Sequence, residues 1–565
     1  MSTTIVRPSV VEGLCEKHRT TLDQAITAIA TRGYWSAYSE NPGGYPEADI
    51  AAGKAAFEAY RDRRFPLDQP GTASWEGEER SPYGFPLGVT YPHPDIDALL
   101  AAMQAALPGW RDAGVEWRAG ICLEVLARLN ARSHEIANAV MHTTGQAFGM
   151  AFQAGGPHAQ ERGLEAVAYA VSAMRRVPEA AEWVKPQGKR PPLRMEKRYH
   201  IVPRGLALVI GCNTFPTWNA YPGIFASLVT GNPVLVKPHP GAVLPLAITV
   251  STIRSVLSEA GLDPNVICLA AERADQRIAA SLATRPEIRI IDFTGSSAFG
   301  NWLEENALQA AVFTEKAGVN TVVIDGTDDY RGMLRNLAFT LSLYSGQMCT
   351  TSQNLLVPEA GISTDAGHRS FDEVTQDLAR AIDDLLGDPA RAAALLGAIV
   401  NRDVLSRLEA AASLSSVVRP SQALEHPDYP GAVVRTPLLV RLTSADRTAY
   451  SSECFGPVTF VIATAGTGES LDIWSRTLAS RGALTAAVYA TDVEVLERAE
   501  RIAIEGGVAL SLNLTDGVYV NQSAAFSDYH ATGANPAANA TLCDDAFVTP
   551  RFRVVQVRRH LPPSA

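Results

Sequence analysis

A cysteine and a glutamate stand in surroundings that suit covalent chemistry. Cys349 follows a Gly-Gln turn and is flanked by small hydroxyl residues in the run 344–351. This pattern predicts an exposed thiol whose pKa is lowered by local backbone dipoles, and therefore a nucleophile. Glu315 follows an apolar run and precedes Gly318, where a carboxylate would line a pocket rather than face solvent. We expect burial to raise the pKa of Glu315, which suits a general base.

The elements that must position these residues alternate between short apolar runs and helical segments. The runs lie at 206–210, 233–236, 266–270 and 288–293, and a second series begins at 321–324 and 354–357. Strands and helices at this spacing predict parallel sheets that bind ligands at the carboxyl ends of their strands. No G-x-G-x-x-G fingerprint follows any run, so a nucleotide cofactor would be held in another way.

Changes in the pattern of apolar, basic and proline- or glycine-rich segments divide the chain into four regions. We expect a helical and irregular N-terminal arm over 1–94, with helices near 11–32 and 48–63, and a nucleotide-binding domain over 95–314. A basic hairpin at 185–203 within that domain is expected to serve oligomerisation. A catalytic domain follows over 315–545, and an oligomerisation strand over 546–565 could join a sheet edge, including that of another subunit. The predicted fold class is α/β: a Rossmann-type cofactor domain, a second α/β catalytic domain and a small strand element.

Charge and hydropathy exclude several classes of protein. The 565 residues carry a formal net charge of −11, which argues against general binding to nucleic acids or membrane surfaces. No apolar run reaches the roughly 20 residues of a bilayer span, and the first residues lack a signal-peptide layout, so we expect a cytoplasmic protein. The 7 cysteines are scattered without ligand spacing, so neither a disulfide framework nor a metal site is expected.

These motifs resemble the aldehyde dehydrogenase superfamily over most of the chain, from about Trp117 to the end. The Gly346–Cys349 run is similar to the family's nucleophile motif, and Glu315 with Gly318 is similar to its base motif, with Ala317 in place of one glycine. Cys349 follows Glu315 by 34 residues, which is the family's spacing. The resemblance implies that Cys349 attacks an aldehyde carbon and that Glu315 activates water to hydrolyse the resulting thioester.

The resemblance also implies residues for the oxyanion and the cofactor. Asn213 lies in a segment similar to the family's oxyanion segment, although Thr214 is an insertion and Asn219 competes for the role. The implied cofactor-binding residues are Lys237 and His239 of the Lys-Pro-His-Pro run, Thr294, Gly295 and Ser296 of the pyrophosphate turn, and Glu453 and Phe455 at the nicotinamide ribose. NAD-preferring members carry a glutamate where Pro240 stands, so NADP is favoured over NAD.

Within the superfamily, the long arm, the Lys-Pro-His-Pro run and the extended C-terminal region resemble the PaaN group of phenylacetate degradation. This implies oxidation of an aldehyde, in particular a CoA-linked semialdehyde from aromatic breakdown, by a homodimer or a dimer of dimers. Basic residues between 185 and 198 form either a docking strip for a CoA phosphate or a solvated hairpin at a subunit contact. The alternatives are a CoA-acylating dehydrogenase and, from another class, a non-catalytic oligomeric scaffold.

Overall fold

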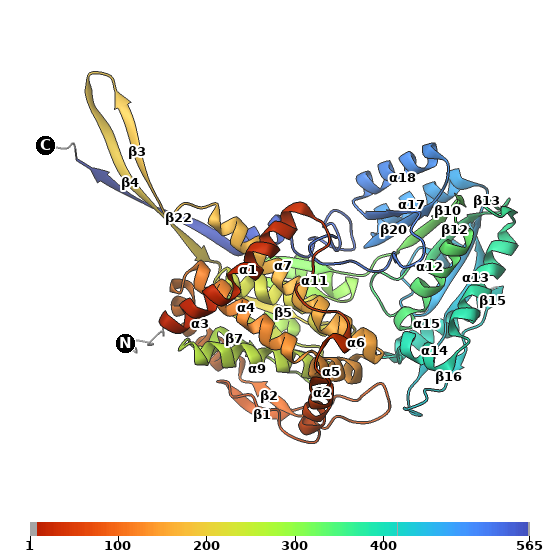
Figure 1. Cartoon of the computed structure of the whole chain (residues 1–565), viewed down its shortest axis with the longest axis horizontal. Coiled ribbons are helices and arrows are strands. Elements are labelled where there is room, and N and C mark those ends of the chain that lie inside the picture. The colour runs from red at the N-terminus through yellow and green to blue at the C-terminus, as the bar shows by residue number, and fades with distance from the viewer. Residues whose placement is uncertain (1–7, 415, 563–565) are drawn as a thin grey trace.

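Two parallel sheets form two domains, and a strand arm projects from the first of them (Figure 1). The computed structural model describes residues 8–414 and 416–562. Within these ranges, no helix combines the length and the apolar character that crossing a membrane requires.

The first domain is built on a five-stranded parallel sheet in the order β7-β6-β5-β8-β9. Its strands are β5 (Leu206–Ile210), β6 (Val234–Lys237), β7 (Ile267–Leu269), β8 (Ile288–Thr294) and β9 (Ala311–Glu315). Their side chains are largely buried because helices cover both faces, as is usual for parallel sheets. The strands expected at 206–210, 233–236, 266–270 and 288–293 are confirmed.

Helices make up most of the rest of this domain and surround its sheet (Figure 1). They are α3 (Ile96–Asp112), α4 (Val115–Ala131), α5 (Ser133–Thr144), α6 (Phe148–Gly155), α7 (Pro157–Arg175), α8 (Pro216–Val229), α9 (Leu244–Glu259), α10 (Ala279–Ala283) and α11 (Ser297–Asn306), with the short η2 (Pro264–Val266). Ser296 caps α11 by accepting a hydrogen bond from the Phe299 N–H. The N-terminus of α11 therefore follows directly on the carboxyl end of β8.

The first 94 residues pack against the first domain. They contain α1 (Pro8–Thr31), η1 (Pro42–Gly44), α2 (Glu47–Tyr60) and the β1 (Thr72–Glu76) and β2 (Tyr91–Pro94) pair. α1 packs on α4 and α7, and α2 packs on α5. Phe57, Phe65 and Tyr91 are buried in the core that these helices share. Both expected helices are confirmed, and this region contributes to the core because its apolar positions face the domain.

The second domain carries a seven-stranded sheet in the order β15-β18-β19-β12-β10-β20-β21, in which only β15 runs antiparallel to its neighbour. Its strands are β10 (Thr321–Ile324), β12 (Asn354–Pro358), β15 (Val417–Arg419), β18 (Leu438–Thr443), β19 (Val458–Thr464), β20 (Thr485–Tyr489) and β21 (Ala509–Leu512). Its helices are α12 (Tyr330–Ser342), η3 (Leu343–Gly346), α13 (Phe371–Leu386), α14 (Pro389–Leu395), α15 (Arg402–Ala412), α16 (Arg447–Tyr450), α17 (Thr467–Arg481) and α18 (Val493–Gly506). Small strands β11 (Gly326–Thr327), β13 (Ile362–Thr364), β14 (Gly367–Arg369), β16 (Ala423–Leu424) and β17 (Val434–Arg435) complete it.

After β21 the chain crosses back to the first domain. Phe526 and Cys543 are buried in the core of that domain, and Ala538 forms a β-bridge with Glu315 at the end of β9. The short α19 (Asp545–Val548) and η4 (Thr549–Arg551) then lead to the last strand. The returning segment thus lies over the carboxyl end of the first sheet.

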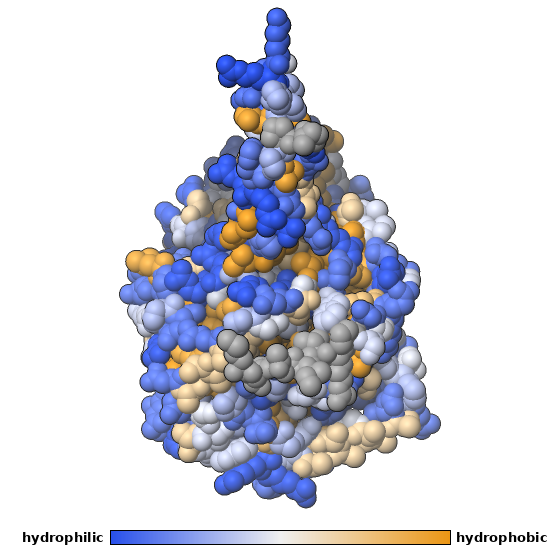
Figure 2. All heavy atoms as spheres, turned by 90° about the vertical axis from the view of Figure 1, so that its left-hand side faces the viewer, coloured by the Kyte–Doolittle hydropathy of each residue, from blue (hydrophilic) through white to orange (hydrophobic). Residues whose placement is uncertain are grey.

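The projecting arm is a three-stranded antiparallel sheet in the order β22-β4-β3. It joins β3 (Ala180–Gln187), β4 (Arg190–Pro203) and β22 (Phe552–Leu561). The terminal strand therefore completes a hairpin of its own chain. Exposed apolar side chains on the arm are Val184, Leu193, Val554, Val555 and Val557. Figure 2 looks at this side of the molecule and shows hydrophobic atoms scattered among hydrophilic ones on the arm.

Candidate active site

The loop that carries Cys349 begins with a strained turn. Tyr344, Ser345 and Gly346 have φ angles of 53°, 50° and 64°, in the left-handed region that side chains other than glycine seldom adopt. A Cβ on Gly346 would lie 2.4 Å from the Gly456 carbonyl oxygen, so only glycine fits there. The Ser345 hydroxyl donates to the Gly397 carbonyl at 3.0 Å and helps to hold the turn.

Two buried amides fix the position of this loop. The Gln347 side chain donates to the Ala398 carbonyl and accepts from the Val400 N–H, both at 3.0 Å. Asn320, which directly precedes β10, donates to the Cys349 carbonyl at 2.8 Å. Sequence reasoning did not single out Asn320; its position as a polar residue at the start of a buried strand was the available signal.

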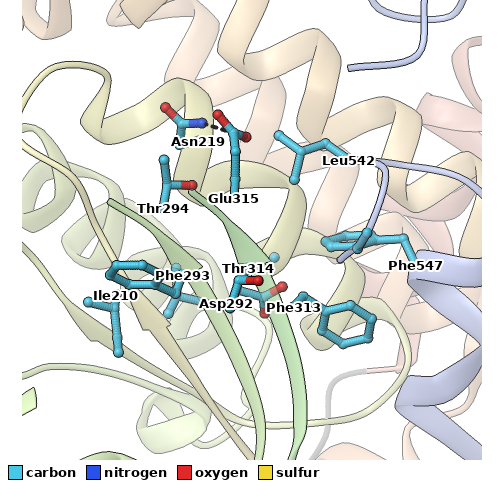
Figure 3. A pocket seen from close by; sticks show the side chains of 13 residues that line it. Ile210, Asn219, Asp292, Phe293, Thr294, Phe313, Thr314, Glu315, Leu542 and Phe547 are labelled. Carbon is cyan, nitrogen blue, oxygen red and sulfur yellow. Dashed lines mark hydrogen bonds between the residues drawn. The ribbon is translucent and has the colours of Figure 1, made fainter. Parts of the chain in front are cut away.

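Cys349, Glu315, Asn219 and His530 meet between the two domains. The Asn219 Nδ2 lies 3.3 Å from the Glu315 Oε2, as Figure 3 shows at the ends of β8 and β9. The His530 Nε2 lies 3.3 Å from the other oxygen, Oε1. The side-chain ligand atoms of Glu315, Cys349 and His530 all lie within 4.8 Å of one another, so the three groups form one cluster. Sequence reasoning missed His530 entirely.

Both pKa expectations for this site are wrong in direction. Burial raises the pKa of the Cys349 thiol well above its ordinary value, and the neighbouring negative charge of Glu315 raises it further. Burial also raises the pKa of Glu315, but the charge of His530 and hydrogen bonds from His530, Cys349 and Asn219 outweigh it, so the net pKa is lowered. The resting site therefore pairs a protonated thiol with an ionised carboxylate.

Asn213 does not face this cluster. Its Nδ2 donates to the Thr143 carbonyl at 3.1 Å, and its Oδ1 lies close to Gly241 in the loop after β6. The residue that reaches Glu315 is Asn219, which lies inside α8. The structure thus corrects the expected placement of Asn213 beside the nucleophile and brings the competing asparagine there.

Cys349 lies between two cavities. One, of about 700 Å³, is lined on its inner side by Cys349, Asn219 and His530. Apolar side chains that include Phe215, Trp218, Phe339 and Tyr519 line its walls. Tyr34 of the N-terminal region, which is 88% exposed, lines its outer end. A second, smaller cavity on the other side of Cys349 is lined by Glu453 and Phe455.

The residues of the expected pyrophosphate turn cluster at the carboxyl end of the first sheet. Thr294 ends β8 beside Glu315, with which it is paired in the sheet. The Gly295 N–H donates to the Glu315 carbonyl at 3.0 Å, which ties the turn to the catalytic strand. Ser296 caps α11, whose first N–H groups suit a bound phosphate.

Lys237 and His239 lie at the neighbouring strand end. Lys237 is buried and forms an ion pair with Glu272, a residue that sequence reasoning did not consider. Arg277 lies 3.4 Å from the same carboxylate. Burial, with the charges of Lys237 and Arg277, lowers the pKa of His239 to about 4, so its ring is neutral. His239 accepts a hydrogen bond from the Gly241 N–H at 3.1 Å.

These groups suit a nicotinamide dinucleotide. A buried cation and carboxylate can bind ribose hydroxyls, the N-terminus of α11 can bind a pyrophosphate, and Glu453 can bind a second ribose next to Cys349. Phe455 is held in place by its carbonyl, which accepts from Arg407 at 2.9 Å. The chemistry of the donors therefore fits the cofactor.

Comparisons with known proteins agree with this geometry. A model described as the aldehyde dehydrogenase family matches residues 90–535. An NAD-dependent aldehyde dehydrogenase from Burkholderia multivorans is 58% identical, with a TM-score of 0.96, over 98% of this chain and 99% of that one. A vanillin dehydrogenase from Pseudomonas fluorescens is 26% identical over 73% of this chain and 80% of its own. An N-succinylglutamate 5-semialdehyde dehydrogenase from Chromobacterium violaceum is 27% identical over 71% and 78%.

A thiol and a carboxylate at the junction of a nucleotide-binding sheet and a second α/β domain define a class of NAD(P)-dependent oxidoreductases that act on aldehydes. The chain belongs to the aldehyde dehydrogenase family, because the family model covers most of its length. The expected fold class is thereby confirmed, as is the expectation of an NAD(P)-dependent enzyme.

Proposed function

We propose that Cys349 is the nucleophile and Glu315 the general base of an aldehyde dehydrogenase that releases a carboxylic acid. The observation that carries this proposal is the position of Cys349 between two cavities, with the Glu315 carboxylate beside its thiol. One cavity suits the aldehyde and the other suits the reactive end of the cofactor. The lowered pKa of Glu315 keeps a proton acceptor ready at neutral pH.

The residues of the chain act in a fixed order in this mechanism. The Cys349 thiol passes its proton to Glu315, and the sulfur bonds to the aldehyde carbon, which leaves a negative oxygen. Asn219 donates its amide to that oxygen, the role expected of Asn213. When bound, the nicotinamide cofactor supplies the two-electron acceptor that converts this adduct to a thioester. After Glu315 has released that proton to solvent, it takes a proton from water, the water oxygen bonds to the thioester carbon, and the carbon–sulfur bond breaks. The proton held by Glu315 then passes to the sulfur, so that the carboxylic acid leaves and the Cys349 thiol is regenerated.

We propose a CoA-linked semialdehyde from phenylacetate breakdown as the substrate. The resemblance to the PaaN group supports it, and the aromatic side chains along the larger cavity support an unsaturated or aromatic-derived carbon chain. Glu40 and Asp528 line the cavity and are exposed at the surface, where they would repel phosphates. The CoA phosphates would therefore lie outside the cavity, beyond Glu40 and Asp528, and the narrow pantetheine arm would pass between them and the aldehyde carbon.

We propose NAD rather than NADP as the preferred cofactor, in place of the preference drawn from Pro240. Glu272 places a carboxylate next to Lys237, and this carboxylate can take the role of the glutamate that NAD-preferring members carry where Pro240 stands. A carboxylate there can accept a hydrogen bond from a ribose 2′-hydroxyl and repels a 2′-phosphate. The relative from Burkholderia multivorans, which is described as NAD-dependent, supports the same preference.

We propose a homodimer or a dimer of dimers assembled through the projecting arm. The exposed valines of β22 and the free edge strand β3 support this assembly, because such edges pair readily with a second copy. Some basic residues of the arm form ion pairs with acidic residues of the same arm, for example Arg198 with Glu196. A cytoplasmic location is part of the proposal, and the 7 free cysteines, all within the described residues, support it.

A turnover assay tests the reaction and the substrate together. Aliphatic, aromatic and CoA-linked aldehydes are supplied in turn with NAD or NADP, with and without free CoA. The proposal predicts the highest kcat/KM for the CoA-linked semialdehyde and a free acid as product without added CoA. A product that forms only with free CoA would instead establish the acylating alternative.

A further inference from the structure

We propose that His530 is a positioning residue that holds Glu315 beside Cys349 in its charged form. The proposal rests on the function proposed above and adds a third side chain to its base. A positioning residue is needed because Glu315 is almost completely buried yet must remain an ionised proton acceptor.

The imidazole of His530 is buried, and its neighbours hold it next to Glu315. Its backbone carbonyl accepts from the Leu542 N–H at 3.1 Å, within the segment that returns to the first domain. The Trp218 ring of α8 packs on it edge to face, with centroids 4.6 Å apart. The His530 side chain is only 5% exposed, so the ring has little freedom to turn away.

The contact joins two buried polar atoms that otherwise lack a partner in the described residues. The His530 Nε2 lies 3.3 Å from the Glu315 Oε1, whereas the Oε2 accepts from Asn219. Within 8–414 and 416–562, neither Nε2 nor Oε1 has another hydrogen-bond partner. Buried polar atoms are seldom left without a partner, so the imidazole Nε2 and the carboxylate Oε1 are assigned to each other.

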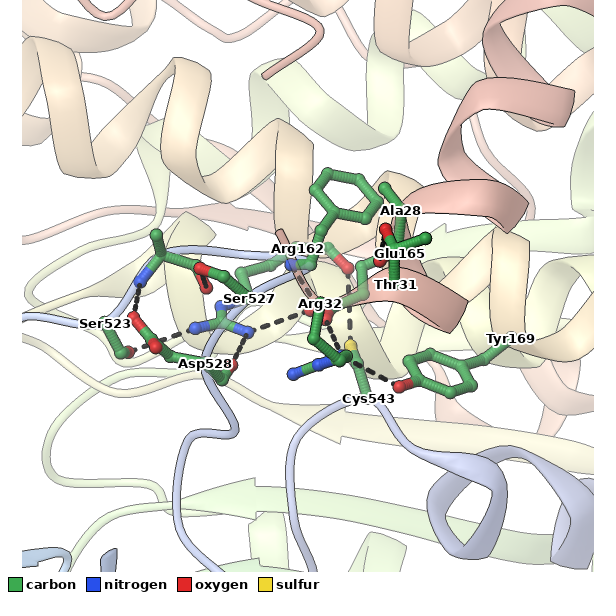
Figure 4. Close-up of polar contacts among 12 residues, drawn as sticks. Ala28, Thr31, Arg32, Arg162, Glu165, Tyr169, Ser523, Ser527, Asp528 and Cys543 are labelled. Atoms are coloured by element: carbon green, nitrogen blue, oxygen red, sulfur yellow. Dashed lines mark hydrogen bonds and ion pairs between the residues drawn. The ribbon is translucent and has the colours of Figure 1, made fainter. Parts of the chain in front are cut away.

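Among the charged groups near His530 in the described residues, Glu315 is the one that its ring nitrogen contacts directly. Arg162 of α7 donates to the Ser523 hydroxyl and is itself paired with Glu165 (Figure 4). Ser523 in turn lies 3.5 Å from the Nδ1 of His530. The Asp528 carboxylate accepts from the Ala524 N–H. The Cys349 thiol, which burial and Glu315 keep protonated, adds no charge.

Removal of His530 is therefore expected to change the pH at which Glu315 ionises, as well as the position of its carboxylate. Glu315 acts as a base above its pKa and loses this function as the pH falls through that value. A positive neighbour lowers the pKa, so its loss must move the acidic limb of the pH–rate profile upward. A residue with a purely structural role would lower the rate without moving this limb.

The test measures hydrolysis of p-nitrophenyl acetate without cofactor, as a function of pH, in the full-length protein. Cys349→Ala and Glu315→Gln are measured first, because the probe reports on the base only if both abolish hydrolysis. If either variant still hydrolyses the ester, the result counts against the proposed function. The His530 variants are then compared by the pH dependence of aldehyde turnover instead. His530→Gln and His530→Ala are then compared with the wild type.

We expect the acidic midpoint to rise by about one pH unit in both variants. At neutral pH, where Glu315 stays ionised, we expect about a tenfold loss of rate because the carboxylate is no longer held beside Cys349. After the hydrolysis that imidazole causes without protein has been subtracted, added imidazole should restore part of the rate of His530→Ala, because it can occupy the space of the lost ring. His142→Gln is the control: His142 is also buried and surrounded by aromatic rings, but it contacts no carboxylate. An unshifted midpoint in a folded His530→Gln variant overturns the proposal, whatever happens to the rate.

Discussion

The side-chain amide of Asn219 lies 3.3 Å from the Glu315 carboxylate, inside the cavity that also reaches Cys349. Asn219 comes from the first turn of α8, whereas most of the expected oxyanion segment precedes that helix. A helical residue is held more firmly than a loop residue, which suits a hydrogen-bond donor that must be in place before charge develops. In the proposed mechanism, this amide contacts Glu315 at rest and would donate to the oxyanion during attack.

Substitution of Asn219 is expected to be far more damaging than substitution of Asn213. Asn219→Ala should lower kcat by about 100-fold, the typical loss of one oxyanion donor. Asn213→Ala removes only a hydrogen bond to the Thr143 carbonyl and should change kcat by less than about threefold. Steady-state kinetics with one aldehyde compare the two, and a slower Asn213→Ala variant would reverse the assignment.

Alkylation of Cys349 should be slow at neutral pH. Burial and the charge of Glu315 raise the thiol pKa, so the reactive thiolate should form only above the ordinary thiol midpoint of about 8.5. Iodoacetamide labelling followed by peptide mass spectrometry gives the rate at each pH. Glu315→Gln removes a negative neighbour and should move the midpoint down. A plateau already reached below neutral pH in the wild type contradicts the pairing described here.

Glu315→Gln should separate the two halves of the reaction. Formation of the thioester should still produce one burst of reduced cofactor per site, although proton removal from the thiol is slower. The steady-state rate should fall by about 100-fold, because hydrolysis loses its base. Stopped-flow absorbance of the reduced cofactor measures both phases. Glu304→Gln is a nearby control, since Glu304 pairs with Lys316 outside the cavities described above.

Glu272→Gln should weaken the preference for NAD over NADP. Loss of the carboxylate removes a charged hydrogen-bond acceptor and a repulsion, so the ratio of the two Kd values should move by about tenfold towards NADP. Calorimetry with each dinucleotide measures this without turnover. Glu78→Gln is the matched control, because Glu78 holds the Ala274 N–H of the same loop but does not contact Lys237. An unchanged ratio contradicts the role given to Glu272.

Local patterns in the sequence were enough to predict the strands of the first sheet, two strands of the second sheet and the turn before Cys349. Apolar runs identify buried strands such as β5 and β10, and the Gly-Gln run identifies the turn before Cys349. These features depend on neighbouring residues, which a single sequence displays directly. The seating of the N-terminal helices on the first domain depends on surfaces far along the chain and was therefore missed.

The composition of the site was harder to predict for the same reason. His530 reaches Glu315 from a segment 215 positions further along the chain. Glu272 reaches Lys237 across two strand ends, so no short motif contains both. The pKa directions were reversed because they depend on these distant partners, whereas the local sequence indicates only burial or a turn. Asn219 was identified only as a competitor, since a one-residue insertion hides the register of α8.

The most direct test of the account is to trap the acyl-enzyme and locate it. Glu315→Gln is mixed with aldehyde and NAD, quenched in acid after one turnover, digested with trypsin and analysed by mass spectrometry. Cys349 and the neighbouring Cys212, whose thiol also lies near Glu315, fall on different tryptic peptides. The account predicts an acyl group on the peptide that contains Cys349. An acyl group on the Cys212 peptide, or none on either, would contradict it.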